Sequence, residues 1–339
     1  MSSDWTRRRF LSRTLGSAVL TPPGAKPDEL ICGISSGLGE RCMEVFEDAF
    51  TRASGIPIGH SLAMGAEQYS ALKARSTSAL HVVNLQDRYL HRAARAGLLA
   101  VIDYTLVPNA EPIADIWRQP AWLGYMHVAV GIVYNAQAVG EPPRDWTDLL
   151  DGRYRGRVAI DRFGRFGLHT LLALAFAHGG GYTDMEPGFR LIRKFAESGA
   201  VLIRDPQHGM RLLRDGRVDA ALWSDARARL LQREERPIEY VAPPAGDVQV
   251  AYGNAIALHS GYQDWSATFL NFTATPQLQT EFASGIYPAS PTHPQAVMAL
   301  RATQPDAQPP GGAHIVPDYD EILPRLGEWS RRWNAAIAG

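Results

Sequence analysis

The sequence predicts an α/β protein of two lobes, each a mainly parallel sheet flanked by helices, joined by two crossing segments. Three observations predict this architecture. Strand and helix signals alternate along the chain. Residues 128–134 form a nearly all-apolar, β-branched run, typical of a strand buried on both faces, which leaves one compact unit and enters the next. Residues 248–258 supply the return strand, and two such crossings leave a cleft that can close by hinge bending.

The first lobe is expected to begin with a strand, a long helix and a second strand. Within residues 38–54 the apolar side chains recur at helical spacing, and Gly55 follows as a helix stop. The remaining signals continue the alternation. The predicted strands are 30–34, 56–58 and 79–85, and the predicted helices are 38–54, 67–75, 87–98, 263–272 and 276–283.

The second lobe starts after Asn135 and the Pro-rich turn at 140–143. Asp145 is a plausible N-cap for a short helix at 146–150, and three glycines at 179–181 end a longer one. The other predicted helices are 168–178, 186–198, 206–215 and 225–235, and the predicted strands are 157–160, 201–203, 220–223 and 238–241.

The tail from His293 onward is expected to pack on the second lobe, with a loop at 308–312 and a final helix at 319–337. Trp329 and Trp333 recur at helical spacing with other apolar residues, which predicts core positions. Pro324 is expected to bend the first turn of this helix.

Composition sets bounds on function. With 339 residues, 45% hydrophobic and 20% charged, the chain is long enough for two ordinary cores. A formal net charge of -1 provides no long-range attraction for nucleic acid, so nucleic-acid binding is not expected. The sequence also lacks an uninterrupted apolar stretch of the roughly 18 residues that a membrane-spanning helix needs.

The N-terminus favours export. The segment T-R-R-R-F-L-S at residues 6–12 is typical of a twin-arginine signal, and a weakly apolar stretch and small residues near Ala25 follow it. We therefore expect residues 1–26 to be an export signal and the protein to be periplasmic. The alternative is a basic disordered tail.

The chain contains two cysteines, Cys32 and Cys42. They fall in the first strand and the next helix, a spacing that usually puts two cysteines too far apart to bridge. In an oxidising compartment a disulfide between them stays open as an alternative.

Ordered blocks of sequence resemble the extracytoplasmic solute-binding proteins of ABC importers, in the branch with spermidine/putrescine binders and their iron, thiamine and phosphonate relatives. The matching pattern is G-I-V-Y-N, a Pro-rich turn, W-x-D-L-L-D-x-x-Y-x-G-x-V-A-I, and an apolar helix ending in Gly-Gly. Further blocks agree in order at 46–58, 219–246, 265–282 and 287–291. The resemblance implies the type 2 periplasmic binding protein fold.

With this resemblance, the lobe boundaries become explicit expectations. Residues 27–131 with 253–292 form lobe 1, and residues 132–252 with 293–339 form lobe 2. The hinge falls where the chain crosses, near Gly131 and Tyr252.

Candidate ligand contacts lie where strands end at the cleft. Ser35, Ser36 and Gly37 join the first strand to a helix, so free backbone N-H groups would point at a polar or anionic group. The loop at 163–167, which includes Arg165, makes a second such turn. Two facing helix N-termini favour negative charge. Gln86 follows another predicted strand and completes this set.

The resemblance implies further contacts. Trp223 occupies the aromatic position that stacks on ligand in polyamine binders, and Tyr252 and Asn254 stand where those proteins place an aromatic residue and a carboxylate. Asp161 matches another acidic contact. Asp225 is a candidate as well, with helix capping as the alternative.

Departures from the polyamine pattern favour an anionic group on the ligand. A buried diammonium needs paired carboxylates, and the second carboxylate appears here as Asn254. Arg41 and Arg88 align where polyamine binders carry aromatic residues. Arginine forks suit carboxylate or phosphonate oxygens, so we expect a small polar organic solute, with an anionic one as the first hypothesis and a polyamine-like one as the alternative.

Metal and enzyme sites are not expected. The histidines show no H-x-x-x-H spacing, the cysteines show no C-x-x-C spacing, and Tyr287 stands alone where the iron branch pairs tyrosines. No G-x-S-x-G, P-loop or H-E-x-x-H motif occurs. An exported enzyme on the same scaffold, or a ligand-presenting accessory of a membrane sensor, are the alternatives.

The expected function is capture of a small-molecule ligand between open lobes, followed by hinge closure and delivery to an ABC permease and its ATPase. We expect a monomer and no cofactor.

Overall fold

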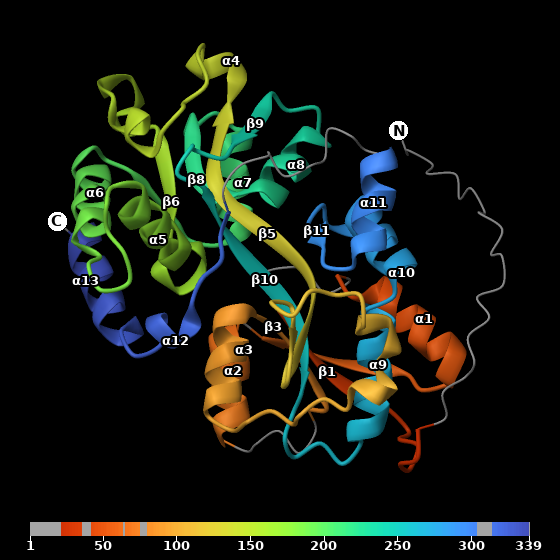
Figure 1. Cartoon of the computed structure of the whole chain (residues 1–339). Helices are drawn as coiled ribbons and strands as arrows, with labels where there is room; N and C mark the ends of the chain where they lie inside the picture. Colours follow the sequence, from red (N-terminus) through yellow and green to blue (C-terminus); the bar gives the residue numbers. More distant parts are fainter. Residues whose placement is uncertain (1–21, 36–41, 64, 75–79, 304–313, 339) are drawn as a thin grey trace.

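A computed structural model describes residues 22–35, 42–63, 65–74, 80–303 and 314–338. Strands and helices alternate along them (Figure 1). The strands are β1 Leu30–Ser35, β2 Ile58–Ala63, β3 Val82–Gln86, β4 Arg118–Gln119, β5 Trp122–Asn135, β6 Val158–Asp161, β7 Val201–Ile203, β8 Ala220–Ser224, β9 Ile238–Val241, β10 Asp247–Ile256, β11 Ser290–Pro291 and β12 His314–Ile315.

The helices flank the strands in both halves of the molecule (Figure 1). They are α1 Glu44–Ser54, α2 Gly65–Ala74, α3 Asp87–Arg95, α4 Ala136–Val139, α5 Leu168–Ala177, α6 Glu186–Glu197, α7 Pro206–Arg214, α8 Asp225–Gln232, α9 Gln263–Thr273, α10 Pro276–Glu281, α11 Pro294–Thr303, α12 Tyr319–Ile322 and α13 Leu326–Ala338. Short helical turns occur at Tyr104–Leu106, Pro108–Ala110, Trp146–Leu150, Gly152–Tyr154, Phe163–Gly167 and Phe282–Ile286.

The sheet confirms the predicted fold class. Its strand order is β2-β1-β3-β10-β5-β8-β6-β7. The three strands at one end run parallel to one another, as do the three at the other end, and β10 and β5 pair antiparallel between them. We call the half around β2-β1-β3 the first lobe and the half around β8-β6-β7 the second lobe. Figure 1 shows β5 and β10 running from one half to the other.

β5 is twice as long as the predicted strand at 128–134, because it begins at Trp122. Gly124 and the half-buried His127 interrupt the apolar run and hid its first half from the sequence pattern. At Gly131 a Cβ atom would lie 2.8 Å from the backbone carbonyl oxygen of Val241, so glycine is required for the close approach of β9.

Aromatic contacts fill the core of the first lobe. Phe46 packs edge-on against Tyr125, with ring centroids 5.6 Å apart, and Phe50 packs edge-on against Phe269. These rings join α1 to β5 and to α9, which returns to the first lobe after β10 as predicted. The return of α9 places the second crossing strand beside the first.

In the second lobe, α5 packs against α6, and α6 packs against α13. Trp146, Trp329 and Trp333 are buried there, which confirms the predicted core role of the last two. The expected helix at 319–337 is two helices, α12 and α13, because Pro324 interrupts the segment.

Several boundaries differ from the sequence prediction. The helix predicted at 38–54 is described as α1 from Glu44, and β2 covers Ile58–Ala63 rather than 56–58. α11 was not predicted, and it packs against α10 in the first lobe. The tail therefore does not pass to the second lobe at His293, because Gln279 of α10 accepts hydrogen bonds from the backbone N-H groups of Thr292 and His293.

The predicted export signal lies mostly outside the described residues, which begin at residue 22. The carbonyl of Gly24 accepts a hydrogen bond from Trp265 Nε1 at 3.3 Å. Cys32 and Cys42 are both buried free thiols, and burial raises the pKa of Cys42 to about 12. Within the described residues, no helix is long and apolar enough to cross a membrane.

A buried carboxyl group ties α3 to the crossing strand β10 and to α12. Asp87 accepts a hydrogen bond from Tyr319 Oη at 2.6 Å and another from the backbone N-H of Ala251 at 2.9 Å. His169 Nε2 lies 3.3 Å from Tyr319 Oη, and burial lowers the pKa of this histidine to about 3. Burial outweighs these bonds at the carboxyl itself and raises the pKa of Asp87 to about 6.

The Trp333→Ala variant should lose about 3–5 kcal/mol of unfolding free energy, because Trp333 is 1% exposed and its removal leaves a cavity beside Phe163. Urea denaturation followed by circular dichroism measures the loss. Asn334→Ala, at an exposed position of the same helix, should change stability by less than about 0.5 kcal/mol. Equal effects in the two variants would contradict the core role of Trp333.

Ionisation of Asp87 should destabilise the fold as pH rises. Because its folded pKa is about 6 and its ordinary value is 3.8, its contribution is fully present below about pH 4 and is lost as pH rises through 6. The difference in unfolding free energy between wild type and Asp87→Asn should fall by up to about 3 kcal/mol between pH 4 and pH 7. Urea titrations at four pH values test this. The exposed control Asn334→Ala, which removes no titratable group, should show a constant difference from wild type, and a constant difference for Asp87→Asn would refute the assignment.

Candidate functional site

A cavity of about 250 Å³, the cleft cavity, lies between the two lobes. Its first-lobe wall includes Gln86 at the end of β3 and Tyr89 on α3, and its second-lobe wall includes Asp161 at the end of β6 and Trp223 on β8. Tyr252 comes from the crossing strand β10. The carboxyl ends of parallel strands from both lobes meet here, which is the usual place for a ligand in open α/β sheets. The lining residues are Gly65, Ala66, Gln86, Tyr89, Asp161, Arg162, Gly164, Arg165, Phe166, Arg204, Pro206, Trp223, Arg227 and Tyr252.

Asp161 is held by its neighbours inside the second lobe. One carboxylate oxygen accepts hydrogen bonds from Arg165 Nε at 2.9 Å and Nη2 at 2.6 Å, and the other accepts from Trp223 Nε1 at 3.2 Å. Burial raises the pKa of Asp161, and the Arg165 charge opposes that rise. Because Arg165 and Trp223 engage both oxygens, this carboxylate is already compensated before any ligand enters.

The turn Phe163–Gly167 brings Arg165 back over Asp161. Its last residue packs so closely on the strand end that a Cβ atom on Gly167 would lie 2.6 Å from the backbone carbon of Arg162. Only glycine fits there. The turn therefore fixes a guanidinium group at the mouth of the second lobe, where Arg165 Nη2 also donates to the carbonyl of Ile203 at 3.0 Å.

Tyr252 and Gln86 link the crossing strand to the first lobe at the floor of the cavity. Gln86 Nε2 donates to Tyr252 Oη at 2.9 Å, across the antiparallel pairing of β3 with β10. Burial raises the pKa of Tyr252, so the phenol is neutral at physiological pH. The aromatic face of Tyr252 and the indole of Trp223 give the cavity its apolar surface.

The charge of the cavity lining is strongly positive. Arg162, Arg165, Arg204 and Arg227 all contribute to it, and Asp161 is the single carboxylate among the lining residues that the structure describes. The guanidinium group of Arg227 lies 5.8 Å from the ring centroid of Trp223 and 5.2 Å from that of Tyr287. The site can therefore offer several charge-assisted donors to an anion.

Five of the predicted site residues are brought together in this lining. They are Gln86, Asp161, Arg165, Trp223 and Tyr252. Ser35 ends β1, and Ser36, Gly37 and Arg41 lie outside the described residues.

Asp225 and Asn254 lie outside the lining, and both bind within the protein. Asp225 accepts a hydrogen bond from the backbone N-H of Ala129 on β5 at 2.9 Å and forms an ion pair with Arg229 at 3.0 Å. Asn254 is fully buried and accepts from Asn84 Nδ2 at 2.8 Å. Their polar side chains thus fasten the crossing strands to their neighbours.

Sequence reasoning missed Tyr89, Arg204 and Arg227 as lining residues. Arg204 directly follows β7, so the strand-end criterion that selected Gln86 would have found it. Tyr89 and Arg227 lie in the first turns of helices α3 and α8, where a cleft-facing position cannot be told from an exposed one without the tertiary structure.

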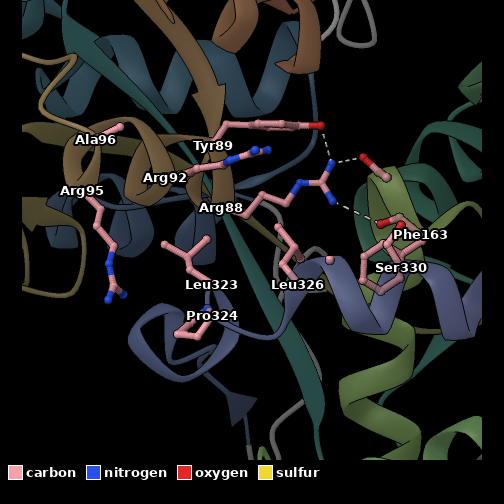
Figure 2. A pocket seen from close by; sticks show the side chains of 12 residues that line it. Arg88, Tyr89, Arg92, Arg95, Ala96, Phe163, Leu323, Pro324, Leu326 and Ser330 are labelled. Carbon is pink, nitrogen blue, oxygen red and sulfur yellow. Dashed lines mark hydrogen bonds between the residues drawn. The ribbon is translucent and has the colours of Figure 1, made fainter.

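A second cavity of about 620 Å³, the α3 cavity, lies between α3 and the α12–α13 corner (Figure 2). Arg88, Arg92 and Arg95 line it from the first lobe, and Leu323, Pro324 and Leu326 line it from the second. It shares Tyr89 and Gly164 with the cleft cavity at their common border. Within the described residues, no group of three or more histidine, cysteine, aspartate or glutamate side chains is placed to hold a metal ion.

The amino-acid sequence is similar to those of known binding proteins. The sequence pattern of the family described as "Bacterial extracellular solute-binding protein" matches residues 81–322. A Salmonella typhimurium protein named "Putative 2-aminoethylphosphonate-binding periplasmic protein" is 23% identical over 303 residues, which are 85% of each chain.

Solved structures share the fold at low identity. An ABC transporter protein from Clostridium perfringens has a TM-score of 0.75 at 19% identity and covers 91% of this chain and 100% of its own. The spermidine/putrescine substrate-binding protein PotD from Streptococcus pneumoniae has a TM-score of 0.73 at 17% identity, covering 91% and 98%. These relatives are binding proteins rather than enzymes. The chain belongs to the bacterial extracellular solute-binding protein family.

Proposed function

We propose that this protein captures a small organic solute with an anionic group, of the aminophosphonate class, in the cleft cavity and delivers it to an ABC permease. The charge of the cavity lining is the observation that carries the proposal. Four guanidinium groups face one carboxylate, and that carboxylate is already bound by Arg165. A phosphonate or carboxylate entering the cavity gains charge-assisted hydrogen bonds and relieves the repulsion among the arginines.

The same lining disfavours a polyamine. A diammonium ligand would need carboxylates at both ends, since an uncompensated buried charge costs several kcal/mol. Asp161 is already compensated, and Asn254 is buried away from the cavity. Putrescine would therefore meet a lining of net positive charge, with no unengaged carboxylate among the described lining residues to balance its own charges.

The amino group of an aminophosphonate would lie against the aromatic residues of the cleft cavity. The faces of Trp223 and Tyr252 can attract an ammonium group, with a gain of about 0.5–2 kcal/mol, and the Gln86 amide oxygen can accept from it. The name of the Salmonella typhimurium relative, which specifies 2-aminoethylphosphonate, supports the same ligand class.

The proposed cycle is binding between open lobes followed by closure about β5 and β10. Closure is favoured because the ligand contacts both lobes only in the closed state, so its affinity for that state shifts the equilibrium. We further propose that the protein is a periplasmic monomer exported by its twin-arginine-like N-terminus. An accessory role, presenting the ligand to a membrane sensor, is the alternative, and loss of solute uptake on deletion of the cognate permease would argue for import.

Calorimetry should show that 2-aminoethylphosphonate binds the purified protein and that putrescine and spermidine do not compete. Arg204→Gln should weaken this binding by about 10-fold or more, since a hydrogen bond to a charged group is worth about 1.5–3 kcal/mol. The matched control Arg190→Gln, at an exposed position on α6, should bind as wild type does.

Tight binding of putrescine or spermidine, with no response to phosphonates or organic acids, would overturn the proposal. Raising the salt concentration should weaken phosphonate binding in wild type, because Arg162 and Arg204 are exposed and their charges are screened. Affinity that is independent of salt would also count against an arginine-lined anion site.

A further inference from the structure

The border between the two cavities is built by one buried arginine. Arg88, on the first turn of α3, donates from Nη1 to the carbonyl of Phe163 at 3.1 Å and from Nη2 to the carbonyl of Gly164 and to Tyr89 Oη (Figure 2). Both carbonyls belong to the turn at the mouth of the second lobe. The side chain therefore spans the gap between the lobes.

The two residues that line both cavities are bonded to this arginine. Tyr89 and Gly164 appear in both linings, while Arg88 itself lines the α3 cavity. The chain of contacts from Tyr89 through Arg88 to Gly164 thus forms a wall with the cleft cavity on one side and the α3 cavity on the other.

Burial and its hydrogen bonds hold the Arg88 side chain of this wall in place. Arg88 is 4% exposed, and its guanidinium carbon lies 4.3 Å from the ring centroid of Tyr89. A planar guanidinium group that binds several acceptors in a fixed fork loses less freedom per bond than a lysine would. Two of its acceptors are main-chain carbonyls, which cannot swing away as side chains can.

Beyond the wall, the α3 cavity is suited to a second anionic group. Arg92 and Arg95 follow Arg88 along the same face of α3, and no aspartate or glutamate is among the lining residues that the structure describes. Arg95 forms an exposed ion pair with Asp320 at 3.6 Å outside the lining, so Arg92 is the main donor for an anion there. Leu323 and Leu326 provide apolar surface opposite them. An extended solute that passed the wall could place a methylene chain on these leucines and its far anion on the arginines.

We propose that Arg88 is a specificity-determining residue that limits the length of the bound solute by closing the cleft cavity off from the α3 cavity. The inference rests on the proposed function, because it assumes that an anionic solute occupies the cleft cavity. With the wall intact, the solute has about 250 Å³. Without it, the space continues into the further 620 Å³ of the α3 cavity.

Two phosphonates of different length test the proposal by calorimetry on the full chain. 3-Phosphonopropionate is short enough for the cleft cavity, and 6-phosphonohexanoate has three more methylene groups and a distant carboxylate. Wild type should bind the short probe at least about 10-fold more tightly than the long one. In Arg88→Ala that ratio should fall by about 10-fold or more, mainly through tighter binding of the long probe.

Matched variants separate the wall from the charge. Arg92→Ala lines only the α3 cavity and should keep the wild-type ratio of short to long probe. In the double variant Arg88→Ala/Arg92→Ala, the long probe should lose about 10-fold relative to Arg88→Ala, because one guanidinium for its far anion is gone. If thermal unfolding shows that Arg88→Ala is not folded, Arg88→Gln replaces it, because the glutamine amide is too short to span the gap as the guanidinium group does. Its ratio of short-probe to long-probe affinity should fall in the same direction.

The outcomes distinguish the two proposals. If wild type binds neither probe nor 2-aminoethylphosphonate, the proposed function fails. If wild type binds the short probe and folded Arg88→Ala or Arg88→Gln keeps the wild-type ratio, the function stands and the role of Arg88 as a length limit is overturned. A wild type that binds both probes equally also overturns it.

Discussion

The antiparallel pairing of β5 with β10 is the constraint on which the rest of the structure depends. These two long strands lie at the centre of the sheet and are shared by both lobes. The parallel strands of the first lobe extend the sheet beyond β10, and those of the second lobe extend it beyond β5. The parallel strands end toward the gap between the lobes, so their terminal residues Gln86 and Asp161 face a common space. The position of the cleft is a consequence of topology and does not depend on any one side chain.

Charge then decides what this space can hold. Polyamine recognition and anion recognition use the same scaffold but need opposite compensation. Here the buried acid Asp161 is neutralised inside its own lobe by Arg165, and the other arginines of the lining give it a net positive charge. The internal ion pair also accounts for the local turn, since Gly167 is needed to let the chain double back over the strand end.

The sequence predicted the architecture well because the relevant signals are local. Alternating apolar strands and amphipathic helices determine the order of elements, and the β-branched run at the end of β5 revealed the crossing. The start of β5 and the position of α11 were missed, since the first depends on pairing with β4 and the second on hydrogen bonds to Gln279. Both are contacts between segments that the sequence pattern does not relate.

The candidate site could likewise be predicted only in part from local sequence signals. Residues at strand ends, such as Gln86, Asp161 and Trp223, could be selected from the sequence because topology places them at the cleft. Asn254 and Asp225 follow the same rule by position, but each side chain turns into the protein and hydrogen-bonds a buried neighbour. Whether a polar side chain faces the ligand or a neighbouring strand depends on tertiary contacts and is not encoded in spacing.

The inter-lobe contacts also bear on how closure is driven. Tyr319 hydrogen-bonds Asp87, and Arg88 hydrogen-bonds the turn at Phe163 and Gly164, so polar groups of the two lobes contact each other directly. A hydrogen bond to a charged group is worth about 1.5–3 kcal/mol, so these bonds favour the arrangement in which the lobes are in contact. The repulsion among the cleft arginines acts in the opposite direction, because closure brings their charges together. An anion of the class proposed above would remove that repulsion and leave the inter-lobe bonds in place, so it would shift the balance toward closure, and a cation of the same size would not.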